Sequence, residues 1–387
     1  MDPSFRWDDT VRGMSTSSFS PAACPRLVVK IGSSLLVDPD GAIRSAWLAT
    51  LVEDVAAAHR AGQQIAIVSS GAIALGARRL KLPKGGRASL EDAQAAAATG
   101  QIALSHIWAE MLGAHGIVAA QILVTLDDLE DRRRYLNASA TLERLLGLSV
   151  IPVINENDSV ATAEIRFGDN DRLAARVAQA AGAQGVILLS DVDGLFTANP
   201  ARDPAAMLIP RVTKIDESIL AMADGGTASG MGSGGMTSKL QAARIANAAG
   251  SSLAIVSGLH DHPLARFAET GRGTVFVPEK SARARKAWLA GRLRVKGSIA
   301  VDAGAARALA GGKSLLAAGA VAVAGAFERG DVIDVLGPEG DAVARGLSEY
   351  DSREAALIAG KRSDRLAEIL GYAPRSALIH RDHLVLL

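Results

Sequence analysis

The sequence has a single cysteine, Cys24, among its 387 residues, and aromatic residues make up only 4% of it. One cysteine cannot form an internal disulfide or a multi-cysteine metal site. Such sparing use of cysteine is typical of proteins in a reducing compartment. We therefore expect a cytoplasmic protein.

An excess of charge of either sign is also missing. The 42 Lys and Arg residues nearly balance the 41 Asp and Glu residues, which gives a formal net charge of +1. This balance provides no electrostatic footprint for nucleic acid or for an anionic membrane. The most apolar run of the later sequence, at 314–327, is shorter than the about 20 residues that cross a bilayer. We expect no membrane partner.

The first 20 residues contain scattered charges and no apolar core of the kind that a secretory signal requires. We therefore expect residues 1–25 to form a disordered leader, with Met14 as a second candidate start.

Apolar, β-branched runs alternate with Ala-rich helical patterns along most of the chain. The predicted strands are 26–31, 64–70, 117–123, 150–154, 185–190 and 252–258, and the predicted helices include 45–61, 90–114, 172–181 and 237–249. Such alternation predicts parallel strands joined by crossover helices. Nearly continuous apolar strands indicate that both faces of the sheet are covered. We expect an α/β/α three-layer sandwich with a mostly parallel sheet at 26–278.

The composition changes after this region. Residues 279–296 are basic and are interpreted as a linker, and short Val, Ala and Gly-rich strands follow. Gly-containing turns between such strands are typical of a small, mostly β domain. We predict that domain at 297–374, with a C-terminal tail at 375–387.

Two lysines lie beside candidate anion-binding turns. Lys30 ends the first strand and is followed by Gly32, Ser33 and Ser34, whose backbone N–H groups enter a helix. Burying an unpaired ammonium is costly, although a lysine at a strand end can also extend its charge to solvent. The second, Lys239, lies in the first turn of a helix after the Gly-rich run at 229–236. Because it opposes the helix dipole there, phosphate is its obvious partner.

The Gly-rich run contains a GxGxxG pattern, but it fits neither familiar nucleotide motif. No strand precedes it, and no acid follows at the distance that a dinucleotide-binding fold requires. A P-loop is excluded because Leu240, not Ser or Thr, follows Lys239. Another turn, VSSGAIALG, ends a strand at Ser69 and Ser70 and begins a helix after Gly71. Serine and glycine at such a turn are common for structural reasons alone, so this signal is weak.

Acids and amides are concentrated after the strand at 150–154. They lie where ligands bind in open α/β sheets, beyond the carboxyl ends of the strands. From the residues alone, three interpretations stay open: a metal site, an acid–base pair, or a pocket for a small zwitterion. Two lysines, two anion-binding turns and this acidic pocket together favour phosphoryl transfer, in which the protein mainly positions groups and neutralises charge.

Four stretches carry a resemblance to a known family: VVKIGSSLL at 28–36, IVSSGAIALG at 67–76, PVINENDSVATAEIRFGDND at 152–171 and SGMGSGGMTSKLQAA at 229–243. From residue 26 to about 382 the chain resembles the amino acid kinase family, and within it the members that phosphorylate the side-chain carboxylate of glutamate. In those members a PUA domain follows the kinase domain. The resemblance implies ATP-dependent formation of L-glutamyl 5-phosphate, the first step of proline biosynthesis.

The resemblance also implies residue roles. Lys30 and Lys239 would contact the transferring phosphoryl group, and Asp169 would hold the two lysines in place. Glutamate would be bound by Ser70, Asp158 and Asn170. ATP would be bound by Lys30, Ser190, Asp191, Ser233, Gly234, Gly235, Met236, Thr237, Ser238 and Lys239. Ser190 and Ser238 stand where the family usually has threonine, and both changes keep the hydroxyl.

A glutamate substrate accounts for the acids and amides together. Asn155, Asn157 and Asn170 can donate to carboxylates, and Asp158 can pair with the ammonium. Under this interpretation Mg²⁺ is held mainly through the phosphates of ATP, with no dedicated metal ligands in the protein.

The resemblance implies a homo-oligomer and inhibition by proline. Two alternatives remain: an amino acid kinase with aspartate or N-acetylglutamate as acceptor, and an RNA-binding PUA protein. Residues 297–374 contain 8 Lys and Arg against 11 Asp and Glu. This net negative charge disfavours RNA as a partner.

Overall fold

The computed structural model describes residues 17–38, 42–160, 170–225, 235–278, 295–375 and 377–387. The chain divides into two compact units. Unit 1 comprises residues 1–130 and 138–280, and unit 2 comprises residues 131–137 and 281–387. Almost all of the predicted linker lies outside the described residues, so the predicted bounds of the linker stay a prediction.

Unit 1 is built on an eight-stranded sheet in the order β3-β4-β2-β1-β5-β7-β8-β6. The pairs are parallel except for the antiparallel pair β7–β8. The strands are β1 (Arg26–Ile31), β2 (Gln64–Ser69), β3 (Ala119–Val124), β4 (Ile151–Glu156), β5 (Gly185–Ser190), β6 (Arg211–Val212), β7 (Ser252–Ser257) and β8 (Thr274–Phe276). The predicted α/β/α sandwich with a mostly parallel sheet is confirmed.

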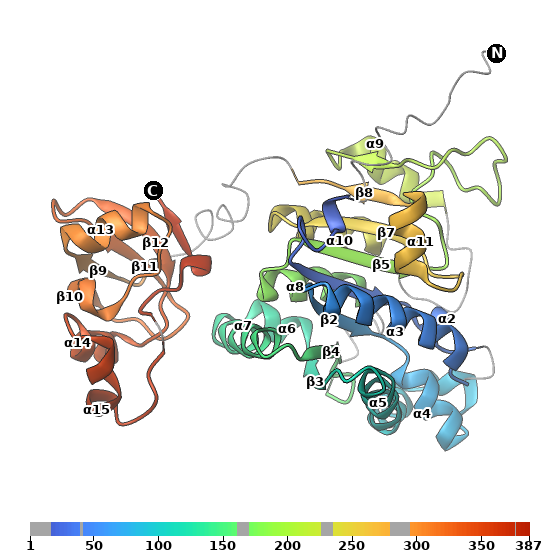
Figure 1. The fold of residues 1–387 in the computed structure, drawn as a ribbon, viewed down its shortest axis with the longest axis horizontal. Coiled ribbons are helices and arrows are strands. Elements are labelled where there is room, and N and C mark those ends of the chain that lie inside the picture. Colours follow the sequence, from blue (N-terminus) through green and yellow to red (C-terminus); the bar gives the residue numbers. More distant parts are fainter. Residues whose placement is uncertain (1–16, 39–41, 161–169, 226–234, 279–294, 376) are drawn as a thin grey trace, which may run out of the picture. The chain divides into compact units, whose positions relative to one another are not determined.

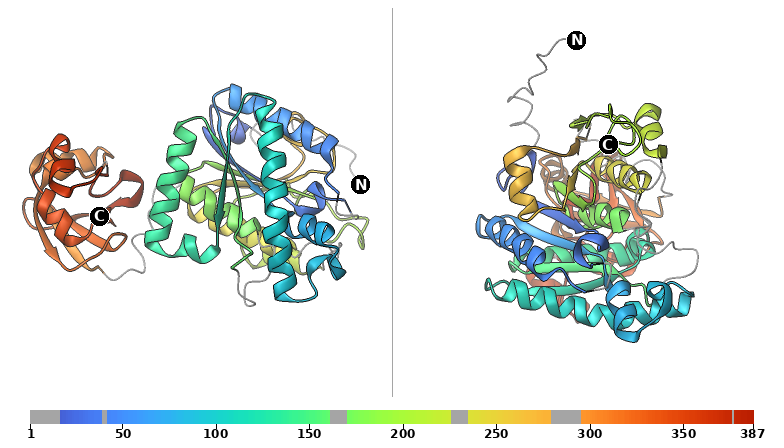
Figure 2. Two further views of the ribbon diagram at one scale, coloured as in Figure 1. Left: turned by 90° about the horizontal axis from the view of Figure 1, so that it is seen from below. Right: turned by 90° about the vertical axis from the view of Figure 1, so that its right-hand side faces the viewer.

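Helices cover both faces of this sheet (Figures 1 and 2). They are α2 (Ser33–Leu36), α3 (Ser45–Arg60), α4 (Ala72–Leu80), α5 (Leu90–Gly113), α6 (Leu126–Glu130), α7 (Arg132–Gly147), α8 (Asn170–Ala181), α9 (Glu217–Ala221), α10 (Met236–Ala248) and α11 (Pro263–Thr270). Helices α3 and α5 contribute apolar side chains to one core cluster with the central strands. Helices α8 and α10 pack on each other, and α8 also contacts β1.

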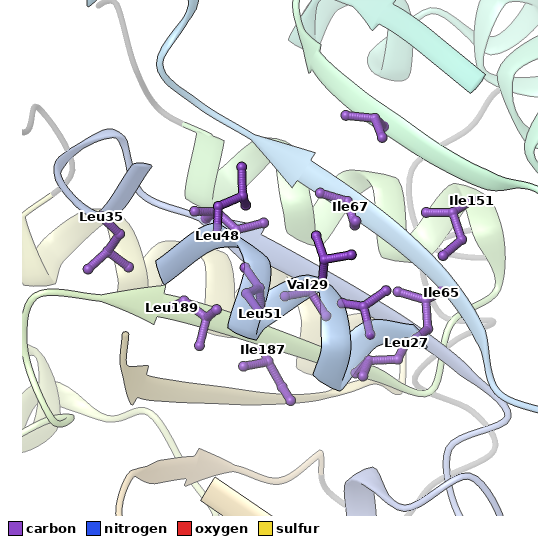
Figure 3. Packing of buried hydrophobic residues seen from close by; sticks show 14 of the residues in the cluster. Leu27, Val29, Leu35, Leu48, Leu51, Ile65, Ile67, Ile151, Ile187 and Leu189 are labelled. Atoms are coloured by element: carbon purple, nitrogen blue, oxygen red, sulfur yellow. The ribbon is translucent and has the colours of Figure 1, made fainter. Parts of the chain in front are cut away.

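The main core lies between the α3 face and the central strands (Figure 3). Leu27 and Val29 of β1, Ile65 of β2, and Leu48 and Leu51 of α3 are all nearly inaccessible to solvent. Because successive side chains of a strand point to opposite faces, every second residue of β1 enters this cluster. The other face of β1 is thereby left to Val28 and Lys30.

Part of the predicted leader is packed rather than disordered. Phe19 is buried, and its ring lies 5.8 Å from that of Phe267. Gln63 donates hydrogen bonds to the backbone carbonyls of Phe19 and Cys24. The prediction of a disordered leader is therefore wrong for residues 17–25, because an aromatic side chain and buried amide contacts anchor them. Residues 1–16 lie outside the described residues.

Unit 2 contains a five-stranded sheet in the order β10-β9-β11-β12-β13. Its strands are β9 (Gly297–Val301), β10 (Ala320–Gly325), β11 (Val332–Leu336), β12 (Ala342–Leu347) and β13 (Leu384–Leu386), and its helices are α13 (Ala303–Ala310), α14 (Ser352–Ile358) and α15 (Leu366–Leu370). β13 pairs with β12. The predicted tail at 375–387 is therefore wrong in part, since the sheet continues into it. Within the described parts of the chain, no helix is long and apolar enough to cross a membrane.

Candidate active site

The predicted site residues come from the ends of adjacent parallel strands. Lys30 is near the end of β1, Ser70 follows β2, Asp158 follows β4, and Ser190 ends β5. The four strands are neighbours in the order β4-β2-β1-β5. Since they run in the same direction, their carboxyl ends meet at one edge of the sheet, where α/β proteins bind ligands.

Two lysines meet on one buried carboxylate at this edge. Lys30 Nζ lies 2.6 Å from Asp171 Oδ1, and Lys239 Nζ lies 3.0 Å from Asp171 Oδ2. All three residues are buried, and Asp171 is only 1% exposed. A single carboxylate thus holds two ammonium groups from β1 and α10 beside each other, and the trio keeps a net positive charge.

The local backbone explains how these charges reach the same place. Asp171 lies in the first turn of α8, where the helix dipole favours a negative charge. Lys239 lies near the start of α10, which begins after Gly235.

Gly71, which precedes α4, has a φ of +109°, and an added Cβ would lie 3.1 Å from a Leu36 methyl carbon. Only glycine readily adopts this conformation.

The lysines determine the ionisation of Asp171. Burial by itself raises the pKa of this carboxyl, but the charges and hydrogen bonds of Lys30 and Lys239 outweigh burial and hold the pKa below its usual value. Asp171 is therefore ionised at neutral pH, and the pair of ammonium groups stays assembled.

A second cluster consists of buried amides. Asn170 Nδ2 donates to Ser70 Oγ at 2.7 Å and to Asn155 Oδ1 at 3.1 Å. Asn155 Nδ2 in turn donates to Gln101 Oε1 at 2.9 Å. Ser70 rather than Ser69 joins this cluster, because Ser69 Oγ accepts from Trp108 Nε1 in the core. The structure thus brings together Ser70 and Asn170, two of the three predicted glutamate ligands.

The third predicted glutamate ligand, Asp158, is a buried carboxyl with an unusual pKa. Burial raises its pKa to about 6, and the charge of Arg87 partly offsets that effect. Because burial disfavours the charged form, the ion of Asp158 gains from any cation that enters beside it. An ammonium group is such a cation.

The structure leaves several predicted roles untested. Ser190 Oγ donates to Asp191 Oδ1 at 3.1 Å beyond β5. Gly235 precedes α10, and Met236, Thr237 and Ser238 form its first residues. Asp169, Ser233 and Gly234 lie outside the described residues. Their predicted contacts, with the lysines and with ATP, stay predictions.

Sequence reasoning missed two residues of this site. Asp171 was passed over in favour of Asp169, two positions away in the same acidic run, and Gln101 was not singled out at all. A position in the first turn of α8 distinguishes Asp171, but the predicted helix begins at residue 172 and so leaves Asp171 outside it. Gln101 gave no signal, because a Gln in an Ala-rich helix forms no distinguishing pattern.

The described part of the chain contains no group of three or more His, Cys, Asp or Glu residues that could hold a metal ion. Asp171 commits both of its oxygens to ammonium groups. The donor set in the described residues therefore suits an anionic ligand better than a bare cation.

Comparison with known proteins places both units in families. Residues 25–257 match the amino acid kinase family, and residues 297–370 match the PUA domain. A protein of Sphingopyxis alaskensis named glutamate 5-kinase is 67% identical over 371 residues, which cover 96% of this chain and 100% of that protein. Proteins of the same name from Zymomonas mobilis and Novosphingobium aromaticivorans are each 63% identical and cover 95% of this chain and 93% and 97% of their own lengths.

Solved structures show more distant likenesses. An isopentenyl phosphate kinase is 17% identical, with a TM-score of 0.44, over 65% of this chain and 100% of its own. A UMP kinase from Bacillus anthracis is 13% identical, with a TM-score of 0.45, over 66% of this chain and 97% of its own.

Proposed function

The chain belongs to the amino acid kinase family, and we propose that it transfers the γ-phosphoryl group of ATP to the side-chain carboxylate of L-glutamate. The product is L-glutamyl 5-phosphate, an acyl phosphate that suits the first step of proline synthesis. The single observation that carries this proposal is the buried pair of Lys30 and Lys239 on Asp171. Relatives named glutamate 5-kinase, at 54–67% identity over nearly the whole chain, support the choice of acceptor.

The chemistry requires charge stabilisation rather than a base. An oxygen of the glutamate carboxylate forms a bond to the γ-phosphorus, and the bond to the β,γ-bridging oxygen breaks with its electrons passing to ADP. The acceptor is already ionised at neutral pH, so no proton has to be removed. Lys30 and Lys239 would neutralise negative charge on the phosphoryl oxygens as that bond breaks.

Asp171 would keep the two ammonium groups at their positions before the substrates arrive. Two like charges this close repel each other, and the shared carboxylate compensates for that repulsion. A preorganised arrangement needs little rearrangement in the transition state, which is the main source of electrostatic catalysis.

The amide cluster and Asp158 would bind the amino acid end of glutamate. Asp158 would pair with the α-ammonium, and Ser70 and Asn170 would supply hydrogen bonds. ATP would lie along the start of α10 and the end of β5, beside Ser190 and Asp191. We assign Mg²⁺ to the ATP phosphates, since the described residues offer no acidic cluster for it. When bound, it supplies further neutralisation of phosphate charge.

The acceptor is tested by trapping the acyl phosphate with hydroxylamine. The full chain is incubated with ATP, Mg²⁺ and one of three acceptors: L-glutamate, L-aspartate or N-acetyl-L-glutamate. We expect a hydroxamate with L-glutamate and little with the other two. A preference for aspartate or N-acetylglutamate would assign the protein to another branch of the family. Hydroxamate formation with none of the three would refute the proposal.

Regulation and assembly are proposed on family grounds. Proline has an α-nitrogen and a carboxylate in the same relation as glutamate, so it would compete for Asp158 and the amide cluster. We also propose a homo-oligomer in the cytoplasm. RNA binding by the PUA domain is the weaker candidate, because residues 297–374 are net negative.

A further inference from the structure

We propose that Gln101, on α5, is a positioning residue that fixes which way the Asn170 amide faces. This inference rests on the proposed function, because it assigns Gln101 a part in recognising the α-ammonium of glutamate. It depends on the polarity of a buried hydrogen-bond chain from α5 to Asn170.

The series of hydrogen bonds begins at Ser105, one turn after Gln101 on α5. The Ser105 hydroxyl donates to the backbone carbonyl of Gln101 at 2.8 Å. Its proton is therefore committed, and its oxygen accepts from Gln101 Nε2 at 3.3 Å. This arrangement turns Gln101 Oε1 away from Ser105, toward Asn155.

The polarity passes from one amide to the next. Gln101 Oε1 accepts from Asn155 Nδ2, so Asn155 Oδ1 faces Asn170 and accepts from its Nδ2. The second N–H of that group donates to Ser70 Oγ. Both N–H groups of the Asn170 amide are thus used within the protein. Turning over any one of the three side-chain amides would place two acceptors or two donors opposite each other.

The other end of the Asn170 amide has no such contact. Asn170 Oδ1 is buried and has no hydrogen-bond partner among the residues that the structure describes. A buried acceptor without a donor is costly, so it favours a ligand that brings an N–H group. The α-ammonium of glutamate is such a group, whereas both glutamate carboxylates are acceptors that this oxygen would repel.

Because these amides are buried, water cannot readily take over the hydrogen bond that Gln101 accepts. Gln101 is 9% exposed, Asn155 3% and Asn170 4%. If Gln101 lost its carbonyl, none of the hydrogen bonds described above would prevent the Asn155 amide from turning over. Asn170 could then turn as well, and its amide nitrogen would face the ammonium.

The test is the Gln101→Met variant of the full chain, assayed with ATP and Mg²⁺. Methionine keeps the length of the side chain and removes both polar atoms. We expect the KM for L-glutamate to rise about tenfold, the change that corresponds to ~1.4 kcal/mol. The KM for ATP should change less than about twofold, because none of the hydrogen bonds from Ser105 to Asn170 involves a residue that is predicted to bind ATP.

A second readout separates positioning from general damage. Glutarate has both carboxylates of glutamate but no α-amino group. The variant should lose affinity for glutamate but not for glutarate, whose affinity is measured as its competitive inhibition constant. The preference for glutamate over glutarate, given by the glutarate inhibition constant divided by the glutamate KM, should therefore fall about tenfold. A merely structural role would weaken both ligands equally.

Gln63→Met is the matched control. Gln63 is 3% exposed, against 9% for Gln101, and its amide donates to two backbone carbonyls outside the site. It should lose stability without changing the glutamate KM. If Gln101→Met fails to fold, Ser105→Ala removes only the anchor of Gln101 and should raise the glutamate KM about two- to threefold.

The outcomes are distinguishable. A wild-type chain that does not phosphorylate glutamate would refute the proposed function, and this inference with it. A wild-type chain that does so, with a glutamate KM in Gln101→Met no higher than in Gln63→Met, would leave the function standing and overturn the role of Gln101. Equal losses for glutamate and glutarate would overturn it too.

Discussion

At the scale of single residues, we expect activity to depend most on Asp171. Replacing it with Asn keeps the shape of the side chain but removes the charge that holds Lys30 and Lys239 together. We expect Asp171→Asn to lower kcat by about 100-fold or more, as loss of a preorganised charge arrangement typically does. Two buried ammonium groups without a counterion should also cost about 3–5 kcal/mol of stability. Steady-state kinetics and denaturant unfolding measure the two effects.

Asp54→Asn is the control for this prediction. The Asp54 side chain is 6% exposed and pairs with His262 at the start of α11. Its loss should lower stability and leave kcat close to that of the wild type. Near-normal turnover in Asp171→Asn would show that the lysines do not depend on it.

The two lysines were predictable from the sequence, whereas their carboxylate was not. A lysine within an apolar strand and another at a helix start each cost free energy without a partner, so the sequence indicates that both have one. Asp169 and Asp171 flank Asn170 and have the same chemistry. Which of them faces the lysines depends on where α8 begins, and that helix begins at Asn170, two residues before its predicted start. Pattern alone cannot fix a helix end to that accuracy.

The raised pKa of Asp158 predicts a pH dependence. In the proposed site the carboxylate form would pair with the glutamate ammonium, and burial raises the pKa of this group to about 6. We expect kcat/KM for glutamate to fall tenfold per pH unit below about pH 6, since this ratio reports the free enzyme. Measurement from pH 5 to pH 8 tests it. In Asp158→Asn that inflection should be absent, the glutamate KM higher and proline inhibition weaker.

Unfolding does not explain such a loss. Because the folded pKa of Asp158 is higher than the unfolded value of about 3.9, the folded state binds the proton more tightly. The contribution of this group to stability therefore increases as the pH falls from about 6 toward 4. An acid loss of kcat/KM that followed a loss of folded protein would contradict the assignment.

At the scale of elements, the site depends on the close packing of α4 and α5. α4 follows Ser70, and α5 carries Gln101, so the two helices support opposite ends of the amide cluster. Their backbones touch at two glycines. A Cβ on Gly76 would lie 1.7 Å from the carbonyl oxygen of Ala96, and one on Gly100 would lie 1.8 Å from that of Ala72.

We expect Gly100→Ala to destabilise the protein by about 3 kcal/mol or more, because the backbone that it meets cannot move aside cheaply. Gly113→Ala, at the end of the same helix, meets nothing within 4 Å. It should be neutral or stabilising by up to ~1 kcal/mol, as alanine usually is in a helix. Urea unfolding of both variants measures the difference. Equal stabilities would mean that α4 and α5 are not packed this closely.

Periodicity predicted the elements better than their contacts. The strands β1 to β5 and β7 follow from their apolar, β-branched runs, and their ends differ by at most two residues. The glycines at positions 76 and 100 could not be recognised as contact points, because they lie 24 positions apart and only the fold brings them together. The same holds for Phe19, whose partner Phe267 lies far away in the sequence.

At the scale of the whole molecule, the site residues that the structure describes belong to unit 1. We predict that a chain ending at Lys296 still forms L-glutamyl 5-phosphate with a kcat within about threefold of the full chain. A unit of this size buries enough surface to fold by itself. We expect regulation or assembly to change in the shortened chain. A folded, truncated protein without activity would show that unit 2 helps to build the site.

In the proposed reaction a glutamate carboxylate oxygen attacks the γ-phosphorus of ATP between Lys30 and Lys239. Glutamate labelled with ¹⁸O in its side-chain carboxylate tests it directly, when the product is trapped with hydroxylamine and the released phosphate is analysed by ³¹P NMR. Hydroxylamine attacks the acyl carbon, so the phosphate leaves with the oxygen that attacked. We expect phosphate that carries one ¹⁸O, and much less of it from Lys30→Ala and Lys239→Ala. Unlabelled phosphate would contradict it, because water rather than glutamate would then have accepted the phosphoryl group.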